Sequence, residues 1–230
     1  MKVLVIDIGG ASIKLLATGR RKAVALPSGP RLTPKEMMAG VRAATRGWRF
    51  DAVSIGYPGA VVRNRVVAEP HNLGPGWTRY DFRRAFGRPV RIVNDAVMQA
   101  LGSYRGGRML FLGLGTGLGA ALILDGVPVP LEIAHLPYRD GRSYEEYVGD
   151  AGLARLGLQR WRRHVAIVVG LLRPALQADY VVLGGGNVRL LDELPAGAQR
   201  GDNANAFRGG FRLWARPVPD TPARGVRGLS

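Results

Sequence analysis

Two segments of this chain share one pattern, in which an apolar strand enters a glycine turn and a second apolar strand follows. In the first segment, Lys2–Ile8 leads through a pair of glycines into Ile13–Ala17. In the second, Met109–Leu114 leads through Gly115–Gly119 into Ala120–Leu124. Nearly continuous runs of Val, Leu and Ile are typical of strands buried on both faces of a sheet, as in α/β proteins. The repetition predicts an α/β chain with two related halves.

Helices and further strands are expected around these two hairpins. Thr33 should cap a helix that has Pro34 at its first position and Glu36 at its third, and that ends near Thr45. Strands are predicted at Ala52–Gly56, Pro89–Val93 and Tyr180–Leu183, and helices at Tyr80–Phe86, Ala96–Tyr104, Tyr144–Gly157 and Gln159–Gln177. Pro174 should kink or break the last helix, because proline has no amide hydrogen to donate.

We place a domain boundary after the helix that ends near Tyr104. The predicted domains are residues 1–103 and residues 104–230. The tail after about residue 216 is rich in Pro, Gly and Arg and is expected to fray.

Composition excludes several classes of protein. Hydrophobic residues make up 47% of the 230 and charged residues 22%, which supports a buried core rather than disorder. No apolar run approaches the roughly 20 residues of a membrane span, and Asp7 interrupts the first run where a secretory signal would continue. Cysteine is absent, which removes disulfides, thiolate metal sites and cysteine nucleophiles. We therefore expect a cytoplasmic protein with no membrane partner.

The chain is strongly basic, with 33 Lys and Arg against 17 Asp and Glu and a formal net charge of +16. Such a charge attracts polyanions, although an arginine-rich, GC-biased genome explains it equally well. Arginines cluster at Arg155, Arg160, Arg162 and Arg163. On a helix, Arg155, Arg162 and Arg163 fall near one face, which predicts a track for an extended polyanion. The alternative is a solvated helix face.

Two glycine turns and one aspartate are suited to phosphate chemistry. Asp7 stands at a strand end beside Gly9-Gly10, where backbone N–H groups can hold a phosphate and the carboxylate can hold Mg²⁺. In the second turn, Gly115 and Gly117 permit close approach of a ligand, and the Thr116 hydroxyl can donate a hydrogen bond. Either turn alone is also explained as a plain β-turn. Two in one chain favour a functional role.

Polar residues follow at two other points. Asn94 and Asp95 stand where a strand passes into a helix, a position where ligands gather in α/β folds. The alternative is that one of them only caps the helix. Glu132 and His135 are spaced to hydrogen-bond adjacent sugar hydroxyls. A zinc pair is the other option, although no further ligand is evident, and His135 could equally be an ordinary satisfied histidine.

In this order the segments resemble the ROK family of sugar kinases and regulators, most closely its polyphosphate glucokinase branch. The matching segments run from residue 3 to about residue 187: Asp7–Gly10 with Lys14, Gly56–Gly59, Asn72-Leu73 with Trp77, Val93–Ala96, Gly115–Gly119, Glu132 with His135, Tyr144–Gly149 and Leu183–Asn187. The resemblance implies the actin-like ATPase fold, with two RNase H-like α/β domains flanking a cleft. Sugar and phosphate donor would meet in that cleft.

The resemblance also implies a role for each matching residue. Asp95 would be the general base that takes the proton from the 6-hydroxyl of glucose or a similar hexose. The other sugar hydroxyls would be held by Asn94, Glu132, His135 and Glu145. The donor, polyphosphate or ATP or both, would be held by Asp7, Gly9, Gly10, Lys14, Gly115, Thr116, Gly117, Gly185 and Gly186. Asp7 would lie near Mg²⁺, zinc is not expected, and the family resemblance implies a homodimer.

Three alternatives stay open. The first is a strictly ATP-dependent ROK hexokinase. The second is a sugar-binding protein without turnover; Ala11 stands where the family pattern has Thr or Ser, whereas the presence of Asp95 and Glu132 argues for catalysis. The third is a sugar-responsive repressor, which the start of the kinase core at Lys2 disfavours because it leaves no room for a helix-turn-helix. We therefore expect no DNA partner.

Overall fold

The computed structural model describes residues 1–202 and 204–215, which form two five-stranded sheets of matching topology. The first sheet contains β1 (Val3–Ile8), β2 (Ser12–Ala17), β3 (Val24–Pro27), β4 (Ala52–Tyr57) and β7 (Val90–Asn94), in the order β3-β2-β1-β4-β7. The second contains β8 (Arg108–Leu114), β9 (Leu118–Leu124), β10 (Val127–Leu131), β13 (Tyr180–Gly184) and β14 (Ala198–Arg200), in the order β10-β9-β8-β13-β14.

Both sheets combine antiparallel and parallel pairing in the same way. In the first sheet β2 pairs antiparallel with β1 and β3, whereas β4 pairs parallel with β1 and β7. In the second sheet β9 pairs antiparallel with β8 and β10, whereas β13 pairs parallel with β8 and β14. This shared pattern confirms the prediction of two related halves that each open with a hairpin.

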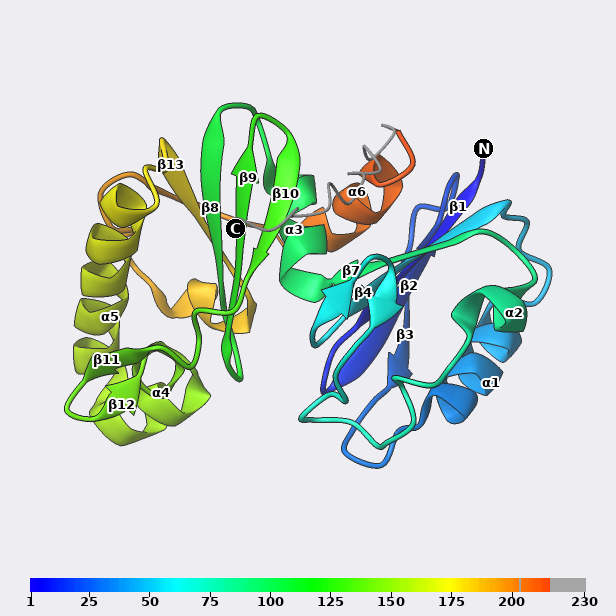
Figure 1. The fold of residues 1–230 in the computed structure, drawn as a ribbon, viewed down its shortest axis with the longest axis horizontal. Coiled ribbons are helices and arrows are strands. Elements are labelled where there is room, and N and C mark those ends of the chain that lie inside the picture. Colours follow the sequence, from blue (N-terminus) through cyan, green and yellow to red (C-terminus); the bar gives the residue numbers. More distant parts are fainter. Residues whose placement is uncertain (203, 216–230) are drawn as a thin grey trace, which may run out of the picture.

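Helices flank the sheets, and two short hairpins project from the loops. The helices are α1 (Pro34–Ala44), α2 (Phe82–Phe86), α3 (Asp95–Ser103), α4 (Glu145–Val148), α5 (Asp150–Ala175) and α6 (Asn205–Arg212), with a 3₁₀ helix at Gly186–Leu190. The hairpins pair β5 (Val61–Val62) with β6 (Arg65–Val66), and β11 (Pro137–Arg139) with β12 (Arg142–Ser143). In Figure 1, α1 and α2 lie outside the first sheet, α5 lies outside the second, and α3 and α6 lie between them.

The helix boundaries follow local chemistry. Thr33 and Glu36 form the predicted capping box of α1, and Asp81 caps α2 by accepting a hydrogen bond from the Arg84 backbone. The predicted separation of two helices near residue 157 is confirmed, because Gly157 has φ 73° and kinks α5. The predicted break at Pro174 is also confirmed, since α5 ends one residue later at Ala175.

Two neighbouring helices join the sheets. α3 packs on the second sheet, where Ala96, Val97 and Ala100 join a buried cluster with Phe111 and Ile123. α6 follows the second sheet in sequence but packs on the first, in a cluster of Val3, Val5, Met98, Ala206 and Phe207. The predicted boundary at residues 103 and 104 therefore stays a prediction, and the predicted fraying after residue 216 lies outside the described residues.

Glycines allow α3 and α6 to pack closely. A Cβ at Gly102 would lie 1.8 Å from the Asn205 carbonyl oxygen, and one at Gly209 would lie 1.7 Å from the Met98 carbonyl oxygen. Neither position could carry a larger residue without moving backbone. Sequence analysis missed α6 because the helix contains Gly209 and Gly210, and glycine is a poor helix former.

Three edge strands were also missed. β3, β10 and β14 are outer strands of their sheets. β10 contains Pro128 and Pro130, and proline is tolerated in a sheet mainly at an edge, where its missing amide hydrogen leaves no partner unpaired. Among the helices of residues 1–202 and 204–215, none combines the length and apolarity that a membrane crossing requires.

Candidate active site

Asp7 lies near the carboxyl end of β1, at the centre of the first sheet. It faces Lys14 in the antiparallel pair with β2 and Gly56 in the parallel pair with β4. Burial raises the pKa of the Asp7 carboxyl, and the nearby Lys14 ammonium partly offsets that rise. Lys14 was predicted only as a donor ligand, and the pairing gives it a second effect, which is to favour the charged form of Asp7.

Asp95 begins α3 directly after the edge strand β7. Asn94 caps the helix, because its Oδ1 accepts hydrogen bonds from the backbone N–H of Ala96 at 2.9 Å and of Val97 at 3.3 Å. Its amide nitrogen donates to the Gly59 carbonyl at 3.2 Å. Three hydrogen bonds thus fix the Asn94 side chain and leave one amide hydrogen for a ligand.

The two aspartates act on each other electrostatically. Burial, with the negative charges of Asp7 and, to a smaller extent, Glu132, raises the pKa of Asp95 to about 7, against the lowering effect of the backbone N–H groups of Ala96 and Asp95. Gly56 lies on the strand between them, and a Cβ there would lie 2.3 Å from Met98 Cε and 3.5 Å from Asp7 Oδ1. Glycine therefore leaves room for α3 to approach β1.

The second glycine turn adjoins the start of α3. A Cβ at Gly119 would lie 3.0 Å from the Ala96 Cβ, directly beside Asp95 in sequence. A Cβ at Gly117 would lie 2.1 Å from Glu145 Oε2, and this oxygen accepts a hydrogen bond from the Leu118 N–H at 3.2 Å. Two motifs far apart in sequence, residues 94–95 and 115–119, therefore meet, and Glu145 lies on the turn.

The segment after β13 packs against the same turn. Gly185 has φ 82°, and a Cβ there would lie 2.2 Å from the Leu114 carbonyl oxygen. Asn187 donates to Asp150 Oδ1 at 2.6 Å, and the Asp150 N–H donates to the Gly115 carbonyl at 3.0 Å. Sequence analysis missed Asp150 because it predicted one helix over Tyr144–Gly157, whereas the structure interrupts that helix at Gly149 and begins α5 at Asp150.

Glu132 and His135 lie in the loop after β10. Both are exposed, and the Glu145 N–H donates to the Ala134 carbonyl at 3.0 Å, which joins this loop to α4. His135 meets His71 of the first domain edge to face, with ring centroids 6.3 Å apart. Sequence analysis missed His71, whose signal was its position next to the matched Asn72.

The carboxylates of the candidate site suit a magnesium ion that is shared with substrate phosphates better than a metal ion bound by protein side chains alone. Among residues 1–202 and 204–215, no group of three or more His, Asp or Glu could hold a metal ion. Mg²⁺ is commonly held by one or two carboxylates together with substrate phosphates and water. Asp7 suits that role, because a cation beside it would relieve the repulsion that Asp95 experiences. The absence of a zinc site stays a prediction.

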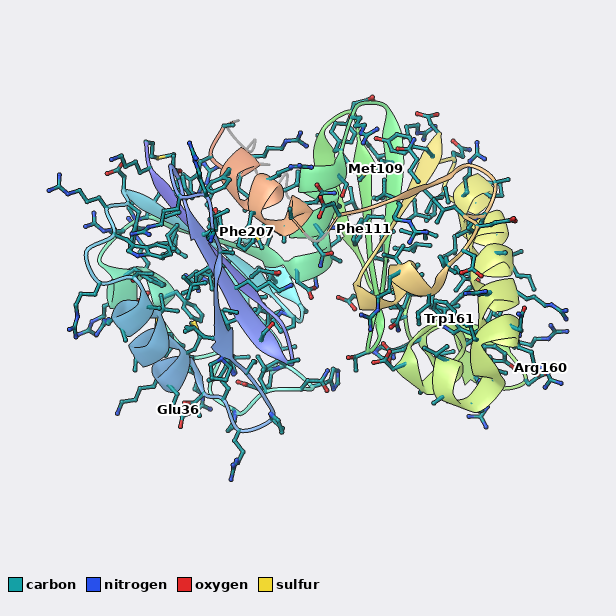
Figure 2. All side chains as sticks on the ribbon, turned by 180° about the vertical axis from the view of Figure 1, so that it is seen from behind. Glu36, Met109, Phe111, Arg160, Trp161 and Phe207 are labelled. Atoms are coloured by element: carbon teal, nitrogen blue, oxygen red, sulfur yellow. The ribbon has the colours of Figure 1, made fainter. Side chains whose placement is uncertain are left out.

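The predicted arginine track on α5 is not supported. Arg162 donates to the Leu190 carbonyl at 2.6 Å and pairs with Asp192, and Arg155 donates to the Glu146 carbonyl at 2.8 Å. Two of the three guanidiniums on that face are therefore already bonded. Figure 2 shows Arg160 on the outer side of α5, whereas Trp161 lies on the inner side.

These features define a class of protein. Two sheets with matching strand order are connected by α3, and carboxylates of the first sheet lie beside glycine turns of the second. This is an α/β protein with the actin-like ATPase fold in two domains. The sequence model of the ROK family matches residues 3–130, more than half of the chain, and the chain belongs to the ROK family.

Individual relatives agree with this assignment. Over 213 residues the chain is 27% identical to the polyphosphate glucokinase of Mycobacterium tuberculosis. The alignment covers 82% of this chain and 78% of that protein. The chain is also 27% identical over 212 residues to the polyphosphate glucokinase of Mycobacterium leprae; that alignment covers 81% of this chain but 64% of the relative, so the chain spans less than two thirds of that protein.

A solved structure confirms the fold. The inorganic polyphosphate/ATP-glucomannokinase from Arthrobacter sp. strain KM aligns with a TM-score of 0.79, over 93% of this chain and 98% of that one. The sequence identity is 23%, so this likeness bears on the fold alone.

Proposed function

We propose that this chain is a sugar kinase that transfers a phosphoryl group from polyphosphate or ATP to the 6-hydroxyl of glucose or a similar hexose. The observation that carries the proposal is Asp95, whose pKa of about 7 is near that of an effective general base at neutral pH. The activities named for the two mycobacterial relatives support the choice of sugar and donor.

In the proposed reaction, Asp95 accepts the proton of the sugar hydroxyl as its oxygen attacks the terminal phosphorus of the donor. The new oxygen–phosphorus bond forms while the bond to the rest of the donor breaks, and the proton ends on the Asp95 carboxyl. Such a transfer depends mainly on positioning and charge stabilisation. The hydrogen bond from the Ala96 N–H to Asp95 Oδ1, at 2.8 Å, orients the carboxylate for this step.

The donor is proposed to bind at the glycine turns. The Gly9 and Gly115 N–H groups already donate to the Ser12 and Gly117 carbonyls, so the other backbone N–H groups of each turn would contact its phosphates, with Thr116 adding a hydroxyl. Gly185 and Gly186 would lie toward the base if the donor is a nucleotide. Asp7 would hold Mg²⁺, which neutralises charge on the transferring phosphoryl group when it is bound.

The sugar is proposed to bind on the other side of Asp95. Glu132 and His135 are exposed in their loop and can hydrogen-bond neighbouring hydroxyls. Glu145 uses Oε2 for the Leu118 N–H, which leaves its second oxygen for the sugar. Asn94 has one amide hydrogen to offer after capping α3. We further propose a cytoplasmic homodimer that does not bind DNA.

A coupled assay of glucose 6-phosphate formation tests the proposal. Purified protein is given glucose and Mg²⁺ with either ATP or long-chain polyphosphate. We expect product with both donors, and polyphosphate at least as effective as ATP. Product with ATP alone would leave the strictly ATP-dependent hexokinase. No product with either donor, in a protein that still binds glucose, would leave a sugar-binding protein without turnover.

A further inference from the structure

A hollow on the outer edge of the first domain is lined by an unusual number of arginines. It has a volume of about 640 Å³ and lies between the β5–β6 hairpin, the edge strand β7 and the loop that leads into α2. Its lining includes Arg63, Arg65, Arg79 and Arg83 but a single acidic residue, Asp81. The four arginines and Asp81 give this site, here called the arginine hollow, a formal charge of +3.

The four guanidiniums of the arginine hollow form no ion pair within the described part of the chain. All four arginines are exposed, and no ion pair or side-chain hydrogen bond is formed by them among the described residues. Asp81 accepts the Arg84 N–H at 2.9 Å as the cap of α2. Glu69, close by, is occupied by the backbone N–H groups of Gly76, Trp77 and Thr78 and by the Thr78 hydroxyl.

The backbone around the hollow is held in place. Asn64 stands between Arg63 and Arg65 in the hairpin turn, and its amide donates to the Val90 carbonyl at 2.9 Å while its Oδ1 accepts from the Ile92 N–H at 2.5 Å. The hairpin is thereby fixed to the edge of β7. Trp77, fully buried, supports the opposite side and packs on Tyr57 with ring centroids 5.7 Å apart. Because the backbone of the hairpin is already held, binding an anion would have to order only the arginine side chains.

The basic surface continues past the hollow. An adjoining depression of about 510 Å³ shares Asp81 and Arg83 and adds Arg84 and Arg88. A surface with several unpaired guanidiniums suits a ligand with many phosphates, because each guanidinium can form a bidentate contact with a phosphate. The arginines of α5 offer no comparable set, since Arg155 and Arg162 are bonded within the chain.

One loop joins the hollow to the candidate active site. It carries His71, whose ring meets His135, and eight residues later Arg79, which lines the hollow. Eight residues span at most about 29 Å between Cα atoms, and less when the loop is not extended. A linear polyanion lying in the hollow therefore has a short route to the carboxyl end of β7, where Asp95 begins α3.

We propose that the arginine hollow is a docking site for the distal part of a long polyphosphate chain whose end is consumed at Asp95. The choice of polyphosphate rests on the proposed function. The site should hold the donor between successive transfers, and we expect it to be indifferent to ATP, whose three phosphates would be held at the glycine turns. It would thus raise affinity for long donors only.

The test compares two double variants with equal charge change. Arg65→Glu/Arg79→Glu alters the hollow, and Arg160→Glu/Arg163→Glu alters exposed positions on α5. Binding of long-chain polyphosphate is measured by calorimetry at several salt concentrations, without turnover. Separately, KM is measured for long-chain polyphosphate, tripolyphosphate and ATP. Arg65→Gln/Arg79→Gln replaces the first variant if thermal unfolding shows that the double Glu protein does not fold.

We expect the hollow variant to bind long-chain polyphosphate at least about tenfold more weakly, with a salt slope lower by about 1.4 for the two lost contacts. KM for ATP and tripolyphosphate should stay within about twofold of the parent value, and the α5 variant should resemble the parent. Equal losses in both variants would overturn the proposal in favour of general charge attraction. A parallel rise in KM for ATP would overturn it in favour of damage to the active site.

Two further results separate this inference from the proposed function. The protein could bind polyphosphate in the arginine hollow and yet not use it as a donor. That result would contradict both polyphosphate as the donor and the role of the hollow in holding it for transfer, although the hollow would remain a binding site for anions. Tighter binding of a single-stranded oligonucleotide than of polyphosphate, lost in the hollow variant, would overturn polyphosphate as the ligand and assign the site to nucleic acid.

Discussion

The two domains have the same strand order, but different kinds of residue stand at the carboxyl ends of their central strands. In the first hairpin, the second residue pair from the turn is Asp7 opposite Lys14. In the second hairpin the corresponding pair is Gly113 opposite Gly119. One hairpin therefore presents charge, and the other presents open space into which the first turn of α3 packs.

This difference assigns separate tasks to the two halves. The first domain supplies the interacting carboxylates Asp7 and Asp95, whose raised pKa values arise chiefly from burial. The second supplies glycine turns that approach α3 closely, and the polar residues Glu132, His135 and Glu145. Changes in the first domain should therefore affect the chemical step, and changes in the second should affect binding and alignment.

The largest expected effect is that of Asp95→Asn. Loss of the general base should lower kcat by at least about 10²-fold while glucose affinity changes little, because the amide keeps the size of the side chain. Steady-state kinetics and glucose titration check both parts. Asp125→Asn, the same substitution in an exposed hairpin turn, is the matched control. A kcat within a few-fold of the parent would contradict the assignment of the base.

The pH profile should carry the signature of the same residue. Asp95 must be ionised to accept a proton, and its pKa is about 7. As the pH falls below that value, the protonated fraction rises and kcat/KM should fall about tenfold per pH unit. The acid limb should be present in Asp125→Asn and missing from the residual activity of Asp95→Asn. A limb centred near the ordinary pKa of an aspartate would contradict the raised value.

The second domain should respond differently. Glu132→Ala and His135→Ala each remove a hydrogen-bonding partner of the sugar, at a cost of about 1–3 kcal/mol in binding. Glucose affinity measured by calorimetry should fall about 5- to 150-fold, whereas the KM for the phosphate donor should change little. Unchanged glucose affinity in both variants would move the sugar site elsewhere.

Much of this division could be predicted from sequence, because it depends on residues at strand ends. Asp7, Asn94, Asp95 and the Gly115–Gly119 turn follow apolar runs that are unambiguous as buried strands. The close approach of Gly119 to Ala96 could not be predicted, since it depends on how α3 packs against the second sheet. Likewise, no local pattern indicates that Arg155 and Arg162 are bonded to distant backbone and side-chain atoms.

A smaller effect is expected from Gly119→Ala. The new methyl group would lie 3.0 Å from the Ala96 Cβ, and since both atoms are attached directly to backbone, α3 must shift by a few tenths of an ångström. Misplacement of Asp95 on that scale should lower kcat about tenfold with little change in stability. Gly170→Ala, where a Cβ meets nothing within 4 Å, is the matched control. Equal kcat in the two variants would show that this contact does not position Asp95.

The edges of the fold were harder to predict than its centre. β10 contains two prolines, and α6 contains the glycine pair Gly209-Gly210, so local propensity opposes both assignments. Both are stabilised by tertiary contacts instead. α6 in particular returns to the first sheet, where the Ser54 hydroxyl donates to the Gly210 carbonyl at 2.6 Å and the Trp214 indole donates to Ser54 at 2.9 Å.

The smallest expected effect concerns this connection between the domains. Arg212 of α6 donates to the carbonyls of Leu101 at 2.5 Å and Tyr104 at 3.0 Å, at the end of α3 where carbonyls have no helical partner. Arg212→Ala should lower the free energy of unfolding by about 1–2 kcal/mol, because charged donors at a helix C-terminus stabilise it. Denaturant unfolding measures this loss, with Arg160→Ala on the exposed face of α5 as the control. Arg212 contacts the C-terminal end of α3, whereas Asp95 lies at its N-terminal end. The kcat at saturating substrates should therefore stay within about twofold of the parent value. A fall in kcat of more than about twofold would mean that α6 sets the position of Asp95. The tasks of the two domains would then be less separate than their strand ends indicate.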